Sequence, residues 1–388
     1  MSAQPPASTN GKRKAALATI LLLFAAGGIA WGVWWWLAGQ WVETTDDAYV
    51  GGNVVQVTPQ AAGTVVAVRA DDTDFVKTGD ELVRLDQADA RVALEQAEAN
   101  LARAVRQVRA LYATDGQLGA TVTQRETELA RAKQDLARRE QASADGAVSR
   151  EEIEHARDAV AASQAALSAA SEQLVASRAL TDGTTVAAHP DVAAAAAKVH
   201  EAFIAYARTT MPAPVSGYVA KRSVQVGQRV SAGTPLMAIV PLDQVWVDAN
   251  FKESQLADVR VGQTATVISD LYGNHVEYRG RVVGFGAGTG AAFALLPAQN
   301  ATGNWIKVVQ RVPVRVVLEP KEIAAHPLQI GLSLRVAIET RDRSGPRLPQ
   351  AERAPAVQET SVFEAPERKA AERIARIIQD NGGGKPRS

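Results

Sequence analysis

The feature that most constrains this chain is a repeat whose two copies lie far apart in the sequence. The matched residues keep one offset of 154 positions: Gly63 and Gly217, Val65 and Val219, Val76 and Val230, Gly79 and Gly233, Leu82 and Leu236. Each copy alternates short apolar strands with glycine turns, which is the pattern of a small β-structure. Two related halves can bury their apolar faces against each other. The repeat therefore predicts one pseudo-symmetric β-sandwich, split between residues 45–86 and 210–241.

The segment between the two copies, residues 87–209, has a helical pattern instead. Apolar residues recur every seven positions along both of its arms and form the expected seam: Leu94, Leu101, Val108, Val122, Leu129, Leu136, Ile153, Val160, Leu167 and Leu174. In the first arm only Asp115 breaks this seam, and small residues fill most neighbouring positions. Sustained heptads with small partner residues predict a closely packed antiparallel coiled-coil hairpin.

Local signals divide the hairpin further. Ser149-Arg-Glu-Glu152 has the spacing of a capping box, so it starts the second helix and sets the tip near Gly146. At ~1.5 Å per residue, the hairpin is expected to project on the order of 80 Å. Irregular patches interrupt both arms at comparable distances from the tip, at residues 114–116 and 181–190. We interpret them as one shared joint or bulge; independent loops between separate helices are the alternative.

An uncharged run from Ala15 to Ala38 predicts a single membrane-spanning helix. Its length of about 36 Å is enough for a ~30 Å hydrocarbon core, and tryptophans crowd its far end, where indoles favour the membrane interface. Basic residues precede the run and acidic residues follow it, which places residues 1–14 in the cytoplasm and the rest beyond the membrane. A cleaved signal peptide is the alternative, but the run is too long and lacks a small-x-small cleavage site.

Beyond the second repeat copy, short alternating strands predict a small β-barrel over residues 242–340. From residue 341 to 388 the chain becomes rich in proline and charge, and we expect a flexible tail there. Within the tail, Glu367 to Asp380 has the pattern of a short amphipathic helix. The predicted fold is therefore an elongated, multidomain α+β chain.

The sequence contains none of the common motifs for catalysis or for binding metals, nucleotides or nucleic acids. Lys plus Arg and Asp plus Glu both number 42, so no basic field indicates nucleic-acid binding, and cysteine is absent, which excludes disulfides and thiolate metal sites. No histidine has a partner at metal-ligand spacing, and no phosphate loop or nucleophile elbow occurs. The stretch from Gly284 to Gly290 is rich in glycine, but no long helix follows it that could bind a phosphate at its N-terminus. We expect no catalytic, metal-binding or cofactor-binding residue, and no enzyme activity.

One enzyme-linked alternative concerns the split sandwich, which resembles the lipoyl and biotinyl carrier fold. In that fold a lysine on a tight hairpin between the two halves carries the cofactor. Here the whole segment 87–209 replaces that hairpin. Lys77 lies on a different turn, before Gly79, and lacks the flanking methionines of the carrier motif. We therefore do not expect a carrier protein.

An anchor, a lipoyl-like domain split by a helical hairpin, and a β-barrel together resemble the membrane fusion proteins, the HlyD-like periplasmic adaptors. Within them the chain looks like the EmrA type. The resemblance covers about residues 15–340 and is carried by Thr45–Val50, Asp74–Gly79, Val245–Glu253 and Leu296–Arg311. The matching barrel positions of the family motif are Trp246, Asn250, Phe251, Asn300, Gly303, Asn304 and Trp305.

The resemblance implies the adaptor subunit of a tripartite multidrug efflux pump. Such an adaptor links an inner-membrane major-facilitator drug/proton antiporter to a TolC-like outer-membrane channel and assembles as a trimer or hexamer. Adaptors of this superfamily often carry Arg-x3-Leu-x6-Ser at the hairpin tip, where it meets the channel. Arg138 and Ser149 stand at that separation, on either side of Gly146, but Ala142 replaces the leucine. An adaptor of a type I protein-secretion system, working with an ABC transporter, is the alternative; a purely structural envelope coiled coil would not need the repeated β halves.

Overall fold

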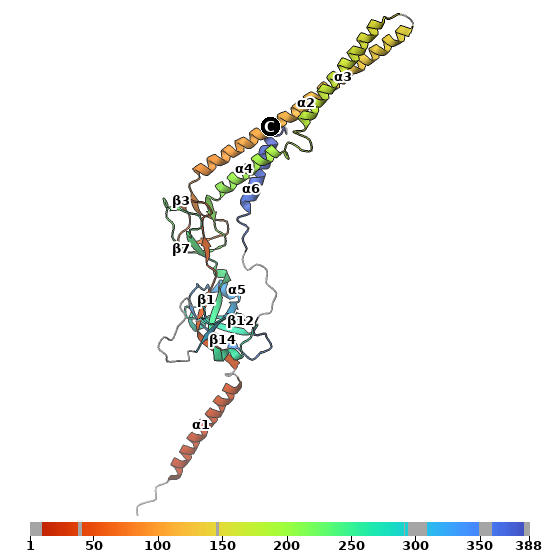
Figure 1. The fold of residues 1–388 in the computed structure, drawn as a ribbon. Helices are drawn as coiled ribbons and strands as arrows, with labels where there is room; N and C mark the ends of the chain where they lie inside the picture. Colours follow the sequence, from red (N-terminus) through yellow and green to blue (C-terminus); the bar gives the residue numbers. More distant parts are fainter. Residues whose placement is uncertain are drawn as a thin grey trace, which may run out of the picture.

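The computed structural model of the chain describes residues 10–37, 41–144, 147–290, 292–293, 309–348 and 359–383. Its parts follow one another along a long axis, from helix α1 (Asn10–Leu37) through a β-barrel and a β-sandwich to a helical hairpin (Figure 1). The chain runs outward through these parts and then returns, so the barrel and the sandwich each combine segments from both directions. The elongated α+β fold predicted from the sequence is confirmed.

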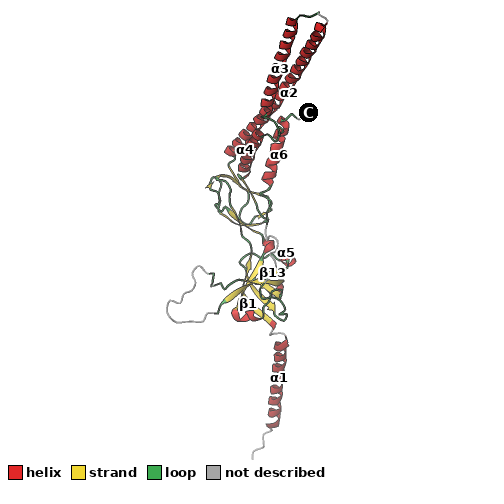
Figure 2. Ribbon diagram, turned by 45° about the vertical axis from the view of Figure 1, so that its right-hand side comes forward, coloured by secondary structure: helices red, strands yellow, loops and turns green. Residues whose placement is uncertain are grey.

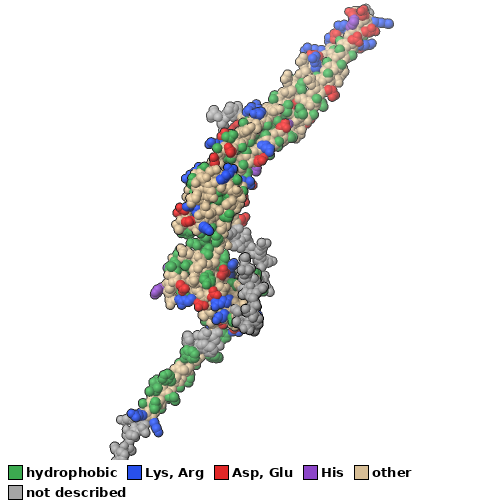
Figure 3. Space-filling model, turned by 60° about the vertical axis from the view of Figure 1, so that its left-hand side comes forward, with side chains coloured by type: hydrophobic (Ala, Val, Ile, Leu, Met, Phe, Trp, Pro, Cys, Tyr) green, Lys and Arg blue, Asp and Glu red, His purple; other side chains and the backbone are tan. Residues whose placement is uncertain are grey.

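Helix α1 stands alone beyond the barrel (Figure 2). Its apolar side chains are exposed on every side, with Phe24 at 79% and Leu21 at 74%. Among the described residues, it is the one helix long and apolar enough to cross a membrane, over Arg13–Val33. Figure 3 shows this apolar surface running along the helix. A soluble helix would not leave so large an apolar surface in water, whereas a lipid bilayer would cover it.

The sandwich consists of two four-stranded sheets, with strand orders β2-β9-β7-β4 and β6-β5-β3-β8. The first half of the repeat supplies β2 (Val55–Val57), β3 (Gly63–Val68), β4 (Phe75–Val76) and β5 (Glu81–Leu85). The second half supplies β6 (Thr210–Pro212), β7 (Gly217–Arg222), β8 (Arg229–Val230) and β9 (Met237–Val240). Exchanging each strand for its counterpart in the other half converts one sheet into the other.

The pseudo-symmetry extends to single hydrogen bonds between the halves. Val65 N donates to Gln228 O at 2.9 Å, and the counterpart of this bond joins Val219 N to Asp74 O at 2.9 Å. Leu82 and Leu236, which are also counterparts, are both buried in the shared core. The two halves thus fold as one unit, as the repeat predicted.

The barrel is closed, with the strand order β1-β10-β13-β12-β11-β14. The five later strands are β10 (Trp246–Lys252), β11 (Thr264–Ser269), β12 (Glu277–Phe285), β13 (Arg311–Leu318) and β14 (Ser333–Glu339). Short helical turns lie at Leu242–Gln244 (η2), Glu253–Ala257 (η3), Gly273–His275 (η4) and Pro320–Ala325 (α5). Phe251 and Tyr278 are fully buried in the barrel core.

The sixth barrel strand corrects the expected boundary of the sandwich. The repeat predicts that residues 45–51 belong to the sandwich, but they are part of β1 (Val42–Gly51), which pairs with both β10 and β14. Without β1 the remaining five strands would leave two open edges, and β1 closes the sheet by pairing with both. Its inward side chains, Ala48 and Val50, are buried in the barrel core.

The hairpin is inserted between β5 and β6. Its outward arm is α2 (Ala88–Ala144), and its return arm consists of α3 (Arg150–Arg178) and α4 (Pro190–Ala207). The expected irregularity at residues 114–116 is wrong, because α2 runs through them without a break. The packing of the long helix overrides the weak local preference of Gly116 for other structure. Only the return arm is interrupted, between Arg178 and Pro190.

The expectation of a flexible tail over 341–388 also needs correction. Residues 365–381 form helix α6 (Ala365–Asn381), which lies against the lower part of the hairpin beside α4 (Figures 1 and 2). Ala370 is fully buried there, and Ile374, Ile377 and Ile378 pack against the apolar cluster of α2 and α4. The tail is rich in charged residues, so its composition alone predicted flexibility. Its helix nevertheless has one apolar side, which α2 and α4 cover.

Candidate functional site

The long seam of the hairpin is its main structural feature. Five of the expected seam residues are buried, namely Leu94, Leu101, Val108, Leu129 and Leu174. The other five are half-buried, namely Val122, Leu136, Ile153, Val160 and Leu167. Above the break in the return arm only α2 and α3 face each other, and the seam residues there are half-buried except for Leu129 and Leu174. Below the break, α6 adds a third helix, and the seam is fully covered there.

The tip of the hairpin is organised by Ser149. Glu152 N donates to Ser149 Oγ at 3.3 Å, and Ser149 N donates to Glu152 Oε2 at 2.9 Å, so the predicted capping box is present. The amide and hydroxyl of Ser149 hold the pKa of the Glu152 carboxyl below its ordinary value. Arg139 also reaches across the tip and donates to Glu152 O at 3.4 Å. These bonds fix the start of α3 opposite the end of α2.

The other expected channel-contacting residues lie on the α2 side of the tip. Arg138 is exposed and donates to Asp135 Oδ1 at 3.1 Å, and Ala142 is half-buried. Gly146 lies outside the described residues. Charged side chains gather around this end of the molecule (Figure 3). The described tip residues 138–142 and 147–152 are therefore mainly small, polar or charged, and Val148, which is half-buried, is the largest apolar side chain among them.

The break in the return arm is a polar joint. Asp115, the one charged residue of the α2 seam, accepts hydrogen bonds from Ser177 Oγ and Thr181 Oγ, both at 2.5 Å. These two donors hold the pKa of the Asp115 carboxyl below its ordinary value. Tyr112 donates from its hydroxyl to Thr184 O at 2.7 Å. The two irregular sequence patches therefore meet, although only one of them is irregular in structure.

His189 completes the joint by capping α4. Asp191 N donates to His189 Nδ1 at 3.2 Å, and His189 Nε2 lies 3.0 Å from Leu180 O. The ring is buried, with the side chain 8% exposed. These partners correspond to a neutral imidazole that accepts at Nδ1 and donates at Nε2. The histidine thus has a structural role at the joint.

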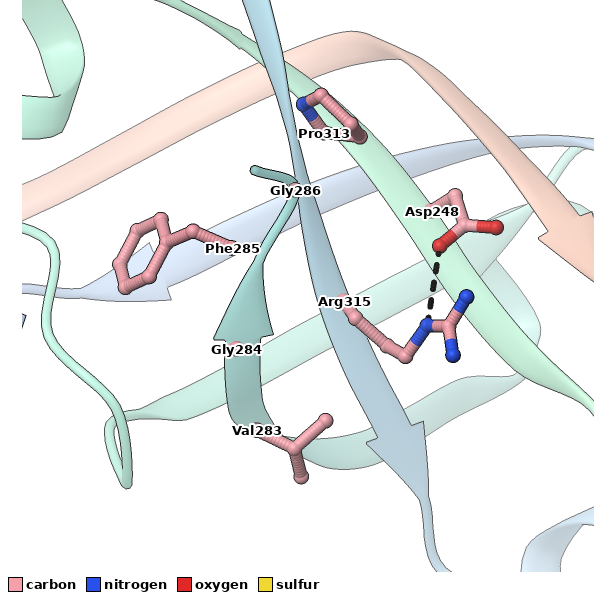
Figure 4. Close-up of a pocket in the computed structure, with 7 residues that line it drawn as sticks. All are labelled: Asp248, Val283, Gly284, Phe285, Gly286, Pro313 and Arg315. Atoms are coloured by element: carbon pink, nitrogen blue, oxygen red, sulfur yellow. Dashed lines mark hydrogen bonds and ion pairs between the residues drawn. The ribbon is translucent and has the colours of Figure 1, made fainter. Parts of the chain in front are cut away.

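On the outer face of the barrel, part of the family motif forms a compact interaction network. Trp246 Nε1 donates to Asp248 Oδ2 at 2.8 Å, and the guanidinium of Arg315 lies 4.3 Å from the centre of the Trp246 ring. Arg315 also approaches Asp248 across β10 and β13, at 3.4 Å from Nε to Oδ1 (Figure 4). Asp248, Arg315 and Phe285 border a shallow hollow of about 340 Å³. The two charged groups at this hollow, those of Arg315 and Asp248, form an ion pair with each other.

A second part of the motif holds the bulge in β1. Thr45 Oγ1 donates to Asn250 O at 2.8 Å, and Asn250 Nδ2 donates to Asp47 Oδ1 at 3.3 Å. Arg311 donates to the other oxygen of Asp47 at 2.5 Å. Phe251, beside Asn250, is a core residue. The remaining motif positions, Asn300, Gly303, Asn304 and Trp305, lie outside the described residues.

Nothing in the described part of the chain assembles a reactive centre. No group of three or more His, Asp or Glu residues there could hold a metal ion. Lys77 lies on the turn between β4 and β5, where its backbone amide donates to Asp80 Oδ2, and the carrier-type hairpin is replaced by α2, α3 and α4. The arrangement provides a long helical arm, a polar tip and an outer barrel face on which Trp246, Asp248 and Arg315 interact with one another.

Sequence reasoning missed two groups of residues. The partners of Asp115 were not identified, although a single carboxylate in an apolar seam required a donor on the facing arm. The docking of α6 was also missed, although the spacing of Ile374, Ile377 and Ile378 indicated an amphipathic face. In both cases the missing information was which distant segment lies opposite.

Several known proteins are similar to this chain. The family model for the EmrA alpha-helical hairpin domain matches residues 88–209. The fatty acid resistance protein FarA of Neisseria gonorrhoeae is 52% identical over 87% of this chain and 86% of its own length. The multidrug export protein EmrA of Escherichia coli K12 is 46% identical over 98% of this chain and 97% of its own length. A solved structure of the periplasmic adaptor protein EmrA covers 77% of this chain and 99% of that chain, at 18% identity and a TM-score of 0.39.

The split sandwich, its inserted hairpin and the closed barrel define the class of membrane fusion proteins. With curated relatives 46% and 52% identical over most of its length, the chain belongs to the EmrA family of these adaptors.

Proposed function

We propose that this protein is the adaptor of a multidrug efflux pump, linking an inner-membrane major-facilitator drug/proton antiporter to a TolC-like outer-membrane channel. The observation that carries the proposal is the 46% identity to the multidrug export protein EmrA of Escherichia coli over 98% of this chain. A match of that extent includes the anchor, the barrel, the sandwich and the hairpin. The adaptor needs no catalytic residue, because the antiporter supplies the energy.

The proposed orientation puts residues 1–14 in the cytoplasm and everything beyond α1 in the periplasm. Arg13 and Lys14 directly precede the apolar run, and acidic residues such as Glu43 follow it. Basic residues favour the cytoplasmic end of a spanning helix. The barrel begins at Val42, close to the end of α1, so it would sit next to the transporter.

The hairpin would then reach toward the outer membrane. The 57 residues of α2 extend about 85 Å at ~1.5 Å per residue. The proposed channel contact uses Arg138, Ala142, Gly146 and Ser149 at the tip. Small side chains such as Ala142 allow helices of a partner to approach closely, and Arg138 offers a charged group at the rim. A trimer or hexamer of adaptors would surround the channel end.

The exported compounds are proposed to be apolar or amphipathic. One relative is named for fatty acid resistance and another for multidrug export, and both names fit cargo with a large apolar part.

Drug susceptibility of a deletion strain tests the proposal. The strain is complemented with the full chain or with a chain in which a short glycine turn replaces residues 88–207. The structure supports this deletion, because Leu85 N donates to Thr209 O at 2.8 Å and the two ends of the gap are adjacent. We expect sensitivity to hydrophobic compounds that only the full chain reverses. Unchanged susceptibility of the deletion strain, or rescue by the chain without a hairpin, would contradict the proposal.

A further inference from the structure

The end of the barrel that faces the anchor is defined by the pairing of β1 with β14. Val42, the first residue of β1, lies beside Glu339, the last residue of β14, and Thr340 N donates to Trp41 O at 2.8 Å. Three residues separate Trp41 from Leu37, where α1 ends. An extended chain covers at most ~3.6 Å per residue, so this end of the barrel lies within about 14 Å of α1 (Figure 2). In a membrane that α1 spans, it therefore reaches the level of the lipid headgroups.

The stretch that follows β14 is fixed against the turn that precedes β11. Val261 N donates to Pro346 O at 3.1 Å, and Gln263 Nε2 donates to Asp342 O at 2.7 Å. The two backbones approach so closely that a Cβ added at Gly345 would clash with Val261 O. Residues 257–263 and 340–348 therefore form one ordered surface at the anchor end of the barrel.

This surface has an excess of positive charge. Its two carboxylates belong to Asp258 and Asp342, so its positive charges outnumber its negative charges by two. These arginines follow the anchor at a great distance in the sequence, so they do not affect the orientation of α1, which depends on charges near its ends. We call the four basic residues the arginine face: Arg260, Arg341, Arg343 and Arg347.

Two guanidinium groups of the arginine face converge on one backbone oxygen. Arg260 Nη1 donates to Ala257 O at 2.8 Å, and Arg347 Nη2 donates to the same oxygen at 3.3 Å. Within the part of the chain that the structure describes, neither guanidinium forms an ion pair with a carboxylate. Two cations held side by side repel each other, and an anion that accepts hydrogen bonds from both would remove this repulsion.

The nearby carboxylates are already engaged. Asp258 Oδ1 pairs with Arg343 Nη1 at 2.9 Å, and Asp342 Oδ1 accepts a hydrogen bond from Ser344 N at 2.9 Å. The guanidinium of Arg343 also lies 5.3 Å from the centre of the Trp41 ring, directly beyond the anchor. The arginine face is thus adjacent to the point where the chain leaves the membrane.

We propose that the arginine face binds the phosphate groups of anionic phospholipids in the leaflet where α1 ends. A guanidinium matches the geometry of a phosphate, and clustered basic residues beside a membrane bind its anionic lipids. The ring of Trp41 favours the same interfacial zone. Lipid binding would hold the barrel against the membrane in one orientation, beyond the tether that α1 provides. The inference rests on the membrane placement in the proposed function, but it does not depend on export.

Fluorescence of the full-length chain in lipid nanodiscs tests the proposal. The chain contains no cysteine, so Leu348→Cys, an exposed position beside Arg347, can carry a single polarity-sensitive dye. The discs contain phosphatidylcholine alone or with about one quarter phosphatidylglycerol. The fluorescence lifetimes of the dye then separate a lipid-contacting fraction from a water-exposed fraction.

The variants change charge at exposed positions only. Arg341 and Arg347 are replaced together by Gln, which removes two charges, or by Lys, which keeps them. The matched control replaces Arg279 and Arg335 by Gln. Both control arginines are exposed, and they lie on the half of the barrel away from the anchor, near the starts of β12 and β14.

In the parent chain, the Lys variant and the control we expect phosphatidylglycerol to raise the lipid-contacting fraction. The Gln variant should lower the ratio of lipid-contacting to water-exposed dye about tenfold in these discs. Equal fractions in both kinds of disc for the parent chain would overturn the proposal and leave the arginine face to an acidic protein partner. An effect that inorganic phosphate removes, but sodium chloride of the same ionic strength does not, would assign the face to a free anion and would also overturn it. None of these readouts involves export, so a failure of the proposed function would be recognised separately by the hairpin deletion.

Discussion

Thr73 and Gly227 occupy equivalent turns in the two halves of the sandwich and share one unusual backbone conformation. Their φ angles are 77° and 86°, and Thr73 is the only described residue other than glycine with a positive φ. Thr73 N donates to Val219 O, and Gly227 N donates to Val65 O, which are counterpart bonds. The symmetry of the fold therefore imposes on a β-branched residue a conformation that suits glycine.

The first prediction is that Thr73→Gly stabilises the sandwich. A side chain in the left-handed region costs about 1–2 kcal/mol, and the greater freedom of glycine in the unfolded chain cancels part of the gain. We expect a net gain of about 0.5–1 kcal/mol in the free energy of unfolding, measured by urea titration of the purified chain. Gly227→Ala is the reciprocal control. It should lose about 1 kcal/mol through backbone strain alone, because nothing lies within 4 Å of the added Cβ. Equal stability of all three chains would contradict the argument.

The second prediction concerns the acid sensitivity of the joint. Hydrogen bonds from Ser177 and Thr181 keep the pKa of the Asp115 carboxyl below its ordinary value of 3.8. Such a group stabilises the folded chain above pH 3.8, and this stabilisation is lost as the pH falls through the lower folded-state pKa. Asp115→Asn should therefore lower the melting temperature near neutral pH, and the difference from the parent should shrink below about pH 4. A difference independent of pH would mean that the carboxylate charge is not what holds the joint.

The third prediction separates the two roles of Ser149. Ser149→Ala removes the cap and should cost about 1 kcal/mol, seen as faster amide exchange in the first turn of α3. Ser149→Asp retains a good capping residue but adds a charge at the tip. If the tip contacts the channel, Ser149→Asp should reduce cross-linking to the channel while leaving amide exchange near the parent rate. A channel contact unaffected by this charge would remove Ser149 from the proposed interface.

The fourth prediction tests the seam. Leu129 is 6% exposed and its neighbour Ala130 is exposed. Leu129→Glu should destabilise the hairpin by at least the ~2–5 kcal/mol typical of losing a buried leucine, and should abolish drug resistance while the protein stays in the membrane. Ala130→Glu places the same charge on the outer surface and should keep resistance at the parent level. Resistance retained in Leu129→Glu would show that an intact seam is not needed for export.

Much of this fold could be predicted because its signals are periodic or repeated. The heptads from Leu94 to Leu136 define one arm, and the offset between Gly63 and Gly217 defines the two halves of the sandwich. Ser149 and Glu152 form the expected capping box because such a motif is local. Each of these patterns is visible within one segment or by comparing two similar segments.

The wrong predictions concern segments whose structure depends on contacts with a distant part of the chain that has a different sequence pattern. The stretch from Thr45 to Val50 has the pattern of a strand, but that pattern does not indicate which sheet it joins. It belongs to the barrel because it pairs with β10 and β14, which would otherwise be open edges. Gly116 favours a break locally, but the packing of a 57-residue helix overrides it. The isoleucines of α6 indicate a helix, but not the surface that it covers. No sequence pattern predicts the ion pair between Arg373 of α6 and Glu98 of α2.

Site-specific photo-cross-linking in living cells tests the central claim, that the hairpin joins the transporter side to the outer-membrane channel. A photoreactive amino acid replaces Ala142 at the tip or, as a control, Tyr49 on the exposed outer face of the barrel. The account predicts a cross-link from position 142 to a TolC-like outer-membrane channel and none from position 49. A channel cross-link from position 49 with none from position 142 would contradict it.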